Sequence, residues 1–290
     1  MVVKHKFGGV WTRKKLVILD EYLKFYTTAL KNMPFKLHYA DAFAGTGSHD
    51  PVIDGEQNIL IPNEDFRGSV LTALSVDPGF YQYHFNDLNP EHVEALNELR
   101  KEFPERNIRV SKLDANRFVP KFCNTLGPDD RAILFLDPYS TQLDWDTLSH
   151  VANSQKIDLW LLFPLSVILR MTPKDGAKVK PEWKSTLDRL LGTSEWEEAL
   201  YKKCEVPVIQ DLFDELDQEL PIERVNSREL QQWVTERLKQ IFPYVAEPTV
   251  LKNKGSPLFL FYFAVSNKSP RAHGLADRVA KHILKKNFGD

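Results

Sequence analysis

The feature that most constrains the fold is a pair of short segments, Ala132–Asp137 and Ile157–Phe163, that are almost entirely apolar. Each has the length of a β-strand, and neither alternates between apolar and polar residues. Such a strand is buried on both faces, which is typical of a parallel sheet covered by helices on each side. A helical pattern at 145–152 separates the two segments, so we expect them to belong to a βαβ unit.

The same alternation continues along most of the chain. Five further strands are predicted, at 37–44, 81–87, 108–113, 244–252 and 258–265. Between 165 and 243 the pattern is helical and charged, with helices expected at 183–191, 194–203, 208–219 and 228–241. The predicted fold is an α/β, doubly wound, mostly parallel seven-stranded sheet that ends in a C-terminal β-hairpin. We expect a Rossmann-like core from 1–164 and 244–290, with 165–243 as a helical insertion after the fifth strand.

Acids stand at the ends of four predicted strands: Asp41, Asp87, Asp114 and Asp137. Because parallel strands end at the same edge of a sheet, these acids are expected to line one crevice. Like charges held together are costly unless donors or cations accompany them, so the ligand should be rich in hydrogen-bond donors or positive charge. Each acid also has a structural interpretation: Asp41 could brace the following turn, Asp87 could cap a helix, and Asp114 could form an Asx-turn with Asn116.

A glycine-spaced turn, Asp41–Gly47, follows the first predicted strand. Glycines at such a point leave bare backbone amides where a small ligand can lie, although the same spacing occurs in plain tight turns. Phe43, Gly45 and Gly47 are therefore candidate binding residues. The next helix is predicted to open at Gly68–Ser69, after an insert of some twenty residues, and its start should face the same ligand.

The Asp41–Gly47 run (Asp-Ala-Phe-Ala-Gly-Thr-Gly) resembles the first motif of class I S-adenosylmethionine-dependent methyltransferases, in a variant common among enzymes acting on DNA and RNA. The resemblance covers 13–164 and 244–290 and implies a Rossmann-like methyltransferase sheet. It implies that Gly45 and Gly47 let the backbone approach S-adenosylmethionine, with Asp41 near the methionyl ammonium. It also implies that Asp87 accepts from the ribose hydroxyls and that Asp114 accepts from the adenine amino group.

Within that superfamily the chain is most similar to the three-Cys-motif partner protein family. The residues that carry this similarity are Trp11-Thr-x-Lys-Lys-Leu16 with Tyr22-Leu23, Gly68-Ser69 before Ala73-Leu74, and Phe135-Leu-Asp-Pro-Tyr139 followed by Trp145. The similarity implies a separate partner, a cysteine-motif protein of the radical-S-adenosylmethionine type. It implies no particular reaction.

Asp137, Pro138 and Tyr139 form the candidate catalytic motif. In amino-methyltransferases a similar strand end reads Asp/Asn-Pro-Pro-Tyr/Phe, where the acid accepts from the target amine and the ring stacks on the base. The present motif has one proline instead of two, so Tyr139 stands one position early. The alternative is a strand-terminating Asp-Pro turn with Tyr139 packed on a helix.

Positive charge is concentrated in three segments that should meet at the rim of the crevice. The candidate substrate-binding residues are Lys14 and Lys15 near the N-terminus, Arg170 and Lys174 after the fifth strand, and Lys252 and Lys254 in the late hairpin. Lysine and arginine on one rim suit a phosphate-bearing substrate such as DNA or RNA. Ordinary solvated side chains are the alternative.

Composition adds limits on the class of protein. The chain has 290 residues, of which 42% are hydrophobic, so it should form a sizeable core. Its net charge of −2 does not indicate a particular class of partner. No apolar run approaches the roughly 20 residues of a membrane-spanning helix and no signal peptide is evident, so a cytoplasmic location is expected. The two cysteines, Cys123 and Cys204, are too few for a disulfide framework or a thiolate metal site.

Two other functions remain open at this stage. One is a non-catalytic subunit that binds the cofactor or nucleic acid on behalf of a partner. The other is a Mg²⁺-dependent phosphoesterase in which the four strand-end acids are metal ligands.

Overall fold

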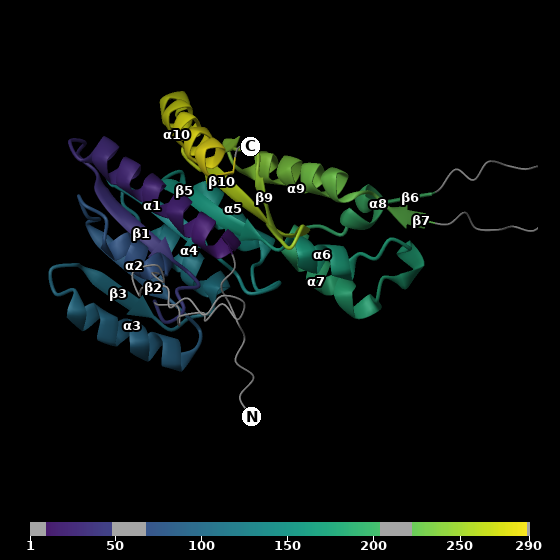
Figure 1. The fold of residues 1–290 in the computed structure, drawn as a ribbon, viewed down its shortest axis with the longest axis horizontal. Coiled ribbons are helices and arrows are strands. Elements are labelled where there is room, and N and C mark those ends of the chain that lie inside the picture. Colours follow the sequence, from purple (N-terminus) through teal and green to yellow (C-terminus); the bar gives the residue numbers. More distant parts are fainter. Residues whose placement is uncertain (1–9, 48–67, 204–221, 289–290) are drawn as a thin grey trace, which may run out of the picture.

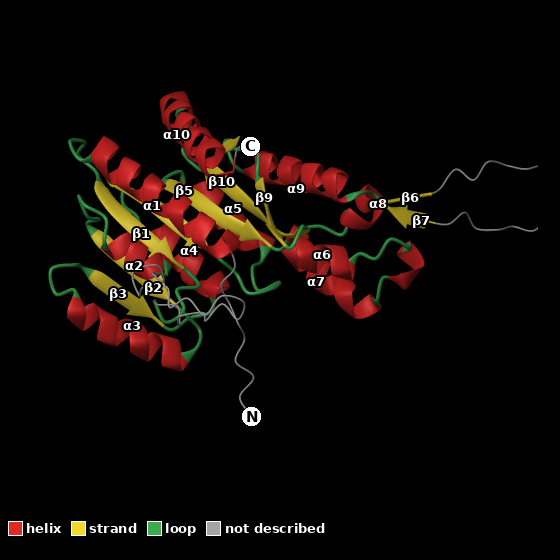
Figure 2. Cartoon of the chain, in the orientation of Figure 1, coloured by secondary structure: helices red, strands yellow, loops and turns green. Residues whose placement is uncertain are grey.

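The structure, a computed structural model, describes residues 10–47, 68–203 and 222–288. Its centre is an eight-stranded sheet in which β1 to β5 are parallel and β10 is antiparallel to β5. The strand order is β3-β2-β1-β4-β5-β10-β8, with β9 also paired to β10 (Figures 1 and 2). The strands are β1 (Lys36–Asp41), β2 (Gln82–Asn86), β3 (Ile108–Ser111), β4 (Asp130–Leu136), β5 (Ile157–Phe163), β8 (Tyr244–Val245), β9 (Thr249–Asn253) and β10 (Ser256–Val265). The predicted mostly parallel, doubly wound α/β fold is confirmed.

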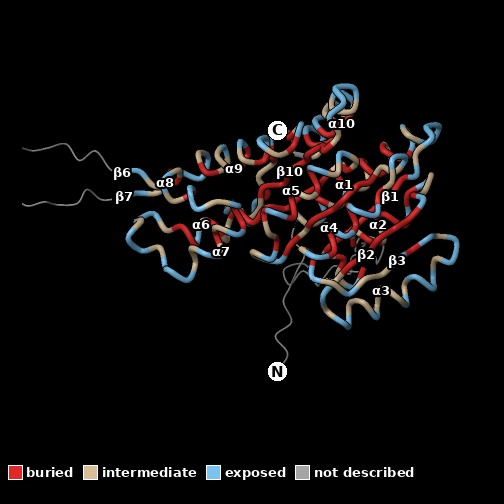
Figure 3. Tube along the Cα trace, turned by 180° about the vertical axis from the view of Figure 1, so that it is seen from behind, coloured by how far each residue is buried: buried red, intermediate tan, exposed pale blue. Residues whose placement is uncertain are grey.

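Helices cover both faces of the sheet. One face packs against α1 (Val10–Leu30), α2 (Ser69–Leu74), α3 (Pro90–Glu102) and α10 (Pro270–Phe288). The other packs against α4 (Ala115–Thr125), α5 (Trp145–Ser154), α6 (Leu165–Met171), α7 (Pro181–Leu191), α8 (Trp196–Leu200) and α9 (Ser227–Ile241). Along β5, Leu159 and Leu161 belong to one core cluster, whereas Trp160 and Leu162 belong to the other. This two-sided burial, visible as the buried centre of Figure 3, explains why the strand has no polar alternation.

The late strands differ from the prediction in one detail, which raises the strand count of the sheet from seven to eight. The segment predicted as one strand at 244–252 is divided into β8 and β9 by Ala246-Glu247-Pro248. Proline has no backbone N–H to give to the strand ladder, so pairing with β10 is interrupted there. The predicted hairpin is present as β9 and β10, joined by Lys254 (φ 48°) and Gly255 (φ 82°), as a two-residue turn with positive φ requires.

The charged segment after β5 is helical, as predicted, but contains a short strand pair. The helix predicted at 194–203 ends at Leu200, and Tyr201–Lys203 forms β6 instead. β6 pairs antiparallel with β7 (Ile222–Arg224), and a short 3-10 helix, η2 (Gly176–Lys178), lies beside β7. The backbone groups of 201–203 form hydrogen bonds with β7 instead of helical ones. Local helix propensity could not reveal this, because β7 lies some twenty residues further along the chain. The helix predicted at 208–219 lies outside the described residues.

The insertion shares the hydrophobic core of the sheet. Leu187, Trp196 and Leu230 are buried in the same cluster as Leu148 and Val151 of α5. The division into a core and an inserted subdomain remains a prediction. Across the described ranges 10–47, 68–203 and 222–288, no helix combines the length and apolarity that crossing a membrane requires.

Candidate functional site

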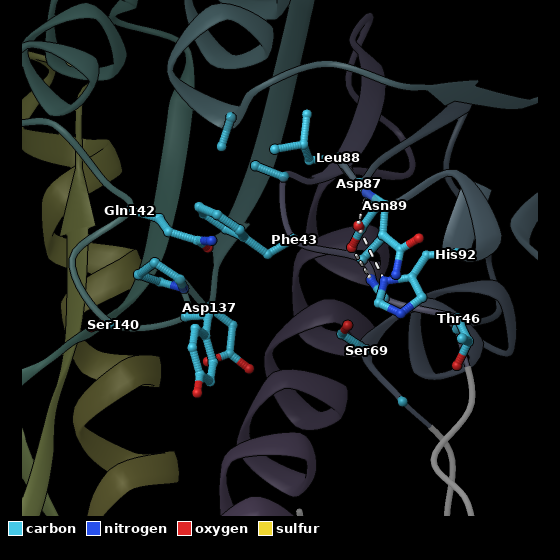
Figure 4. A pocket seen from close by; sticks show the side chains of 18 of the residues that line it. Phe43, Thr46, Ser69, Asp87, Leu88, Asn89, His92, Asp137, Ser140 and Gln142 are labelled. Atoms are coloured by element: carbon cyan, nitrogen blue, oxygen red, sulfur yellow. Dashed lines mark hydrogen bonds and ion pairs between the residues drawn. The ribbon is translucent and has the colours of Figure 1, made fainter. Parts of the chain in front are cut away.

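A cavity of about 920 Å³ lies at the carboxyl ends of the parallel strands. It is bordered by the turns that follow β1, β2 and β4, by the start of α1, by α6 and by the start of β10. Figure 4 shows Asp87 and His92 on one side of this pocket and Asp137 on the other, with Phe43 and Ser69 between them. The predicted crevice is therefore present at the predicted edge of the sheet.

The glycine turn after β1 forms one wall. Gly45 (φ 60°) and Gly47 (φ 80°) both have left-handed backbone conformations, which glycine adopts without strain. A Cβ atom added to Gly45 would meet no other atom within 4 Å, so the main chain there is open to the pocket. A Cβ atom on Gly47 would lie 2.9 Å from the Leu99 side chain, so Gly47 permits the turn to pack on α3.

Asp41 lies beneath this wall and does not line the pocket. Its side chain is completely buried. One carboxylate oxygen accepts a hydrogen bond from the Phe43 amide (3.0 Å) and the other from the Ser69 hydroxyl (2.6 Å). Burial is the main cause that raises the pKa of Asp41 to about 7. The structural interpretation, in which Asp41 braces the glycine turn, is confirmed. The expectation that all four acids line the crevice is wrong for this one.

Asp87 lines the pocket and anchors the glycine turn from β2. Its Oδ2 accepts a hydrogen bond from the Gly45 amide (2.9 Å), and its Oδ1 accepts one from the Asn89 amide (2.8 Å). The Nδ1 atom of His92 lies 3.1 Å from the same Oδ1. The cap of α3 is Asn89 and not Asp87, because the Asn89 side chain accepts from the Glu91 amide (2.9 Å).

Two pocket-supporting side chains near Asp87 were missed in the sequence. His92 lies in the first turn of α3, and the Asn-Pro pair just before it was the only signal that this turn would face the strand end. Asn86, fully buried, donates to the carbonyls of Ala42 (3.1 Å) and Leu113 (2.9 Å) and accepts from the Leu113 amide (3.1 Å). It therefore ties the glycine turn to the segment after β3.

Asp114 lies at the edge of the pocket and caps α4. Its side chain accepts from the Asn116 amide (2.9 Å), so the predicted Asx-turn is confirmed. The side chain of Asn116 in turn holds the loop after β4. It donates to the Gln142 carbonyl (2.8 Å) and accepts from the Asp144 amide (2.9 Å) and the Thr147 hydroxyl (2.8 Å).

Asp137, Pro138 and Tyr139 line the opposite wall. Tyr139 is 63% exposed, which does not support the alternative in which its ring is packed on a helix. Ser140 adopts a left-handed conformation (φ 60°), so the chain turns sharply just after the motif. Asp137 forms an ion pair with Lys15, which reaches it from the buried side of α1.

The six candidate substrate-binding cations separate into two groups. Lys15 and Arg170 line the pocket, whereas Lys14, Lys174, Lys252 and Lys254 do not. Lys15 was predicted to contact substrate phosphate, but its ammonium is already paired with Asp137. Arg170 is exposed, and within the described residues no hydrogen bond or ion pair engages its guanidinium.

The strand-end acids are engaged separately and do not converge on one point. Asp41 binds Ser69, Asp114 caps α4, and Asp137 pairs with Lys15. No group of three or more His, Cys, Asp or Glu side chains is arranged to hold a metal ion in the part of the chain that the structure describes. This arrangement does not support the phosphoesterase alternative. Cys123 is buried, and burial raises the pKa of its thiol to about 12.

Comparison with known proteins supports the fold. Protein-family models and curated proteins gave no match to the sequence. Among solved structures, protein LPL1258 from Legionella pneumophila str. Philadelphia 1 is similar at 12% identity, with a TM-score of 0.54 over 98% of this chain and 94% of that one. The magnesium protoporphyrin IX methyltransferase of Synechocystis PCC 6803, solved with bound SAH, has 13% identity and a TM-score of 0.39, over 87% and 83% of the two chains.

One further solved structure is similar over most of the chain. The N-terminal domain of EvdMO1, solved with SAH and D-fucose, is similar at 8% identity and a TM-score of 0.40, over 85% of this chain and 82% of that one. The match to protein LPL1258, at 12% identity, shows the fold alone, and the two matches with TM-scores below 0.5 carry no argument. The class of protein defined by fold and site is thus a Rossmann-like α/β protein with a pocket at the carboxyl ends of its parallel strands.

Proposed function

We propose that the protein is an S-adenosylmethionine-dependent methyltransferase that acts on nucleic acid or another phosphate-bearing substrate. The observation that carries this proposal is the placement of an open glycine turn, anchored by Asp87, across one pocket from Asp137-Pro138-Tyr139. One wall suits a cofactor that lies against main chain, and the other suits a substrate that is presented to an acid and an aromatic ring.

The residues of the first wall fit S-adenosylmethionine. Gly45 leaves open space for a ligand against the backbone, and Asp87 and Asp114 border that space as acceptors for ribose and adenine donors. Asp41 would act through Ser69, because its carboxylate holds the Ser69 hydroxyl and does not reach the pocket surface. When bound, this cofactor supplies a methyl group whose carbon–sulfur bond breaks, with its electrons staying on sulfur, as an acceptor lone pair bonds to the carbon.

The residues of the second wall orient the acceptor. Asp137 is placed to accept a hydrogen bond, or the proton that is released, from the attacking group, and Lys15 holds the carboxylate in position. Tyr139 offers an exposed ring beside it for stacking. Most of the rate enhancement would come from holding the two reactants in line, so few catalytic side chains are needed.

The proposed protein partner rests on the sequence resemblance alone. Membership of the three-Cys-motif partner family would pair this chain with a cysteine-motif protein of the radical-S-adenosylmethionine type. Such a partner would bring its own cysteines.

One observation favours a non-catalytic subunit as the second candidate function. Lys15 is paired with Oδ2 of Asp137, which reduces the capacity of this carboxylate to accept a proton or a hydrogen bond from a substrate. Incubation of the isolated protein with bulk RNA or DNA and labelled S-adenosylmethionine separates the two. Transfer of label supports the enzyme, and cofactor binding without transfer to any nucleic acid supports the subunit.

The binding proposal is tested by calorimetric titration of S-adenosylmethionine into a matched pair of variants. Gly45→Ala puts a methyl group on the open main chain of the pocket, and we expect it to weaken binding at least about tenfold, a change of about 1.4 kcal/mol. Gly255→Ala introduces the same positive-φ strain in an open turn outside the pocket and should leave the affinity unchanged. Equal affinities for the two variants would remove Gly45 from the cofactor site.

A further inference from the structure

The pocket has a second half whose walls come from outside the glycine motif. We call it the substrate half, and define it by Thr12, Lys15 and Leu16 of α1, Pro138 and Tyr139 after β4, Val167 and Arg170 of α6, and Phe259 of β10. A cavity of about 920 Å³ is near the upper end of the roughly 300–1,000 Å³ that a pocket for one small ligand occupies. The volume therefore leaves room for a second ligand beside a cofactor.

The charge of the substrate half is positive. Lys15 is neutralised by Asp137, which is the only acid among the residues that define or adjoin this half in the described chain. Arg170 adds a guanidinium whose hydrogen-bonding groups are not used by any residue that the structure describes. An arginine presents a planar fork of donors that fits the oxygens of a phosphate. The net charge thus selects an anionic ligand.

The remaining walls are apolar. Leu16, Val167 and Phe259 are partly buried, and Tyr139 exposes 63% of its side chain, more than any other large apolar or aromatic residue of the described chain. A largely exposed aromatic residue beside a cavity is the kind of surface on which a nucleobase stacks. A phosphate on an aliphatic body would use Arg170 but not Tyr139, and an uncharged ring would use Tyr139 but not Arg170.

We propose that the substrate half binds one nucleotide, with its base on Tyr139 and its phosphate on Arg170. This inference deepens the proposed function, and rests on it for the assignment of the other half of the pocket to a cofactor. The nucleotide can be free or part of a DNA or RNA strand, since the two have the same base and phosphate chemistry. Of the six cations that the sequence analysis proposed as substrate-binding residues, the inference assigns phosphate binding to Arg170 alone.

The test is calorimetric titration of the whole chain with the common nucleoside 5′-monophosphates and with short single-stranded DNA and RNA. Each titration is made without and with saturating S-adenosylhomocysteine. We expect at least one phosphate-bearing ligand to bind, and binding by oligonucleotides alone identifies a nucleotide within a strand. Arg170→Met should lower the affinity for that ligand at least about tenfold, because it removes a charge-assisted hydrogen bond. Tyr139→Ala should weaken it by about tenfold as well.

The matched control is Arg117→Met. Arg117 is likewise an exposed arginine near this edge of the sheet, on α4, but it does not line the pocket. The Arg117→Met variant should bind the same phosphate-bearing ligand as tightly as the native protein, and thermal melting should show that all three variants fold. The inference is overturned if no mononucleotide or oligonucleotide binds, or if Arg170→Met binds as tightly as Arg117→Met. If nucleotides bind but S-adenosylhomocysteine does not, the methyltransferase proposal is removed and the nucleotide site stands.

Discussion

Asp158, on β5, is a carboxyl group that the proposed chemistry does not use, and it affects stability. The Tyr22 hydroxyl of α1 donates to its Oδ2 (2.7 Å). Loss of hydration is the main cause that raises the pKa of Asp158 to about 6 from an ordinary value of 3.8. Between those two values the unfolded chain releases a proton that the folded chain keeps. Stability from this group is therefore complete below about pH 4 and is lost as the pH rises through about 6.

Asp158→Asn should remove that pH dependence. The amide oxygen can still accept from Tyr22, but nothing titrates, so the variant should be more stable than the native protein at pH 8 and similar to it at pH 4. We expect a gain of about 1–2 kcal/mol, less than the full conversion of the shift because Asp158 keeps some solvent contact. Urea unfolding across this pH range measures it.

Tyr22→Phe should enlarge the pH dependence of stability that Asp158→Asn removes. It deletes the hydrogen bond that favours the charged carboxylate, so the loss of stability should extend to higher pH than in the native protein. A pH profile of Asp158→Asn that is parallel to the native profile would contradict this account of the residue.

At the scale of elements, the loop between β4 and α5 is held by two other helices, α4 and α7. Asn116 of α4 makes two hydrogen bonds to the loop, at Gln142 and Asp144, and a third to Thr147 in the first turn of α5. Arg189 of α7 adds a hydrogen bond to the Thr141 carbonyl (2.9 Å) and an ion pair with Asp144. The loop begins with Asp137, so these contacts fix the direction of the proposed catalytic motif.

Asn116→Ala should therefore loosen the loop. It leaves the Asp144 amide and the Gln142 carbonyl without their partners, so we expect a loss of about 1–3 kcal/mol in unfolding free energy and faster hydrogen exchange at Asp144. The control is Asn97→Ala on α3, which removes only a local bond to the Val93 carbonyl. Unchanged exchange at Asp144 in the first variant would show that other contacts hold the loop.

The sequence predicts elements better than it predicts which side chains meet. Asp87 and Asp137 stand one residue beyond the ends of β2 and β4, and both line the pocket. Asp41 is instead the last residue of β1, so its side chain still follows the strand alternation. It points to the same face of the sheet as Tyr39, the face that α1 and α2 cover. A shift of one residue in a strand end decided that difference, and such boundaries are the least certain part of a sequence prediction.

Lys15 illustrates the same limit across a longer distance. Its segment was predicted to lie at the rim of the crevice, and Thr12, Lys15 and Leu16 of α1 do line the pocket. Its partner, Asp137, lies 122 residues away in the sequence. The cluster of basic residues around Lys15 therefore indicated a phosphate ligand. The long, flexible lysine side chain instead reaches Asp137, a partner that the local sequence does not reveal.

For the whole molecule, the central feature is that one pocket joins segments from α1, β1, β2, β4, α6 and β10. A parallel sheet with both faces covered leaves its carboxyl edge as the place where these segments converge, so the position of the site follows from the topology. The proposed chemistry depends on how a cofactor and a substrate share that space.

A crystal structure of the protein with S-adenosylhomocysteine tests this account most directly. The account predicts density for the ligand against Gly45 and Asp87, with the sulfur directed across the pocket toward Asp137. It also predicts that the space beside Tyr139 and Arg170 stays open to a second ligand. No density in the pocket at saturating ligand, or density elsewhere on the molecule, would contradict the central claim.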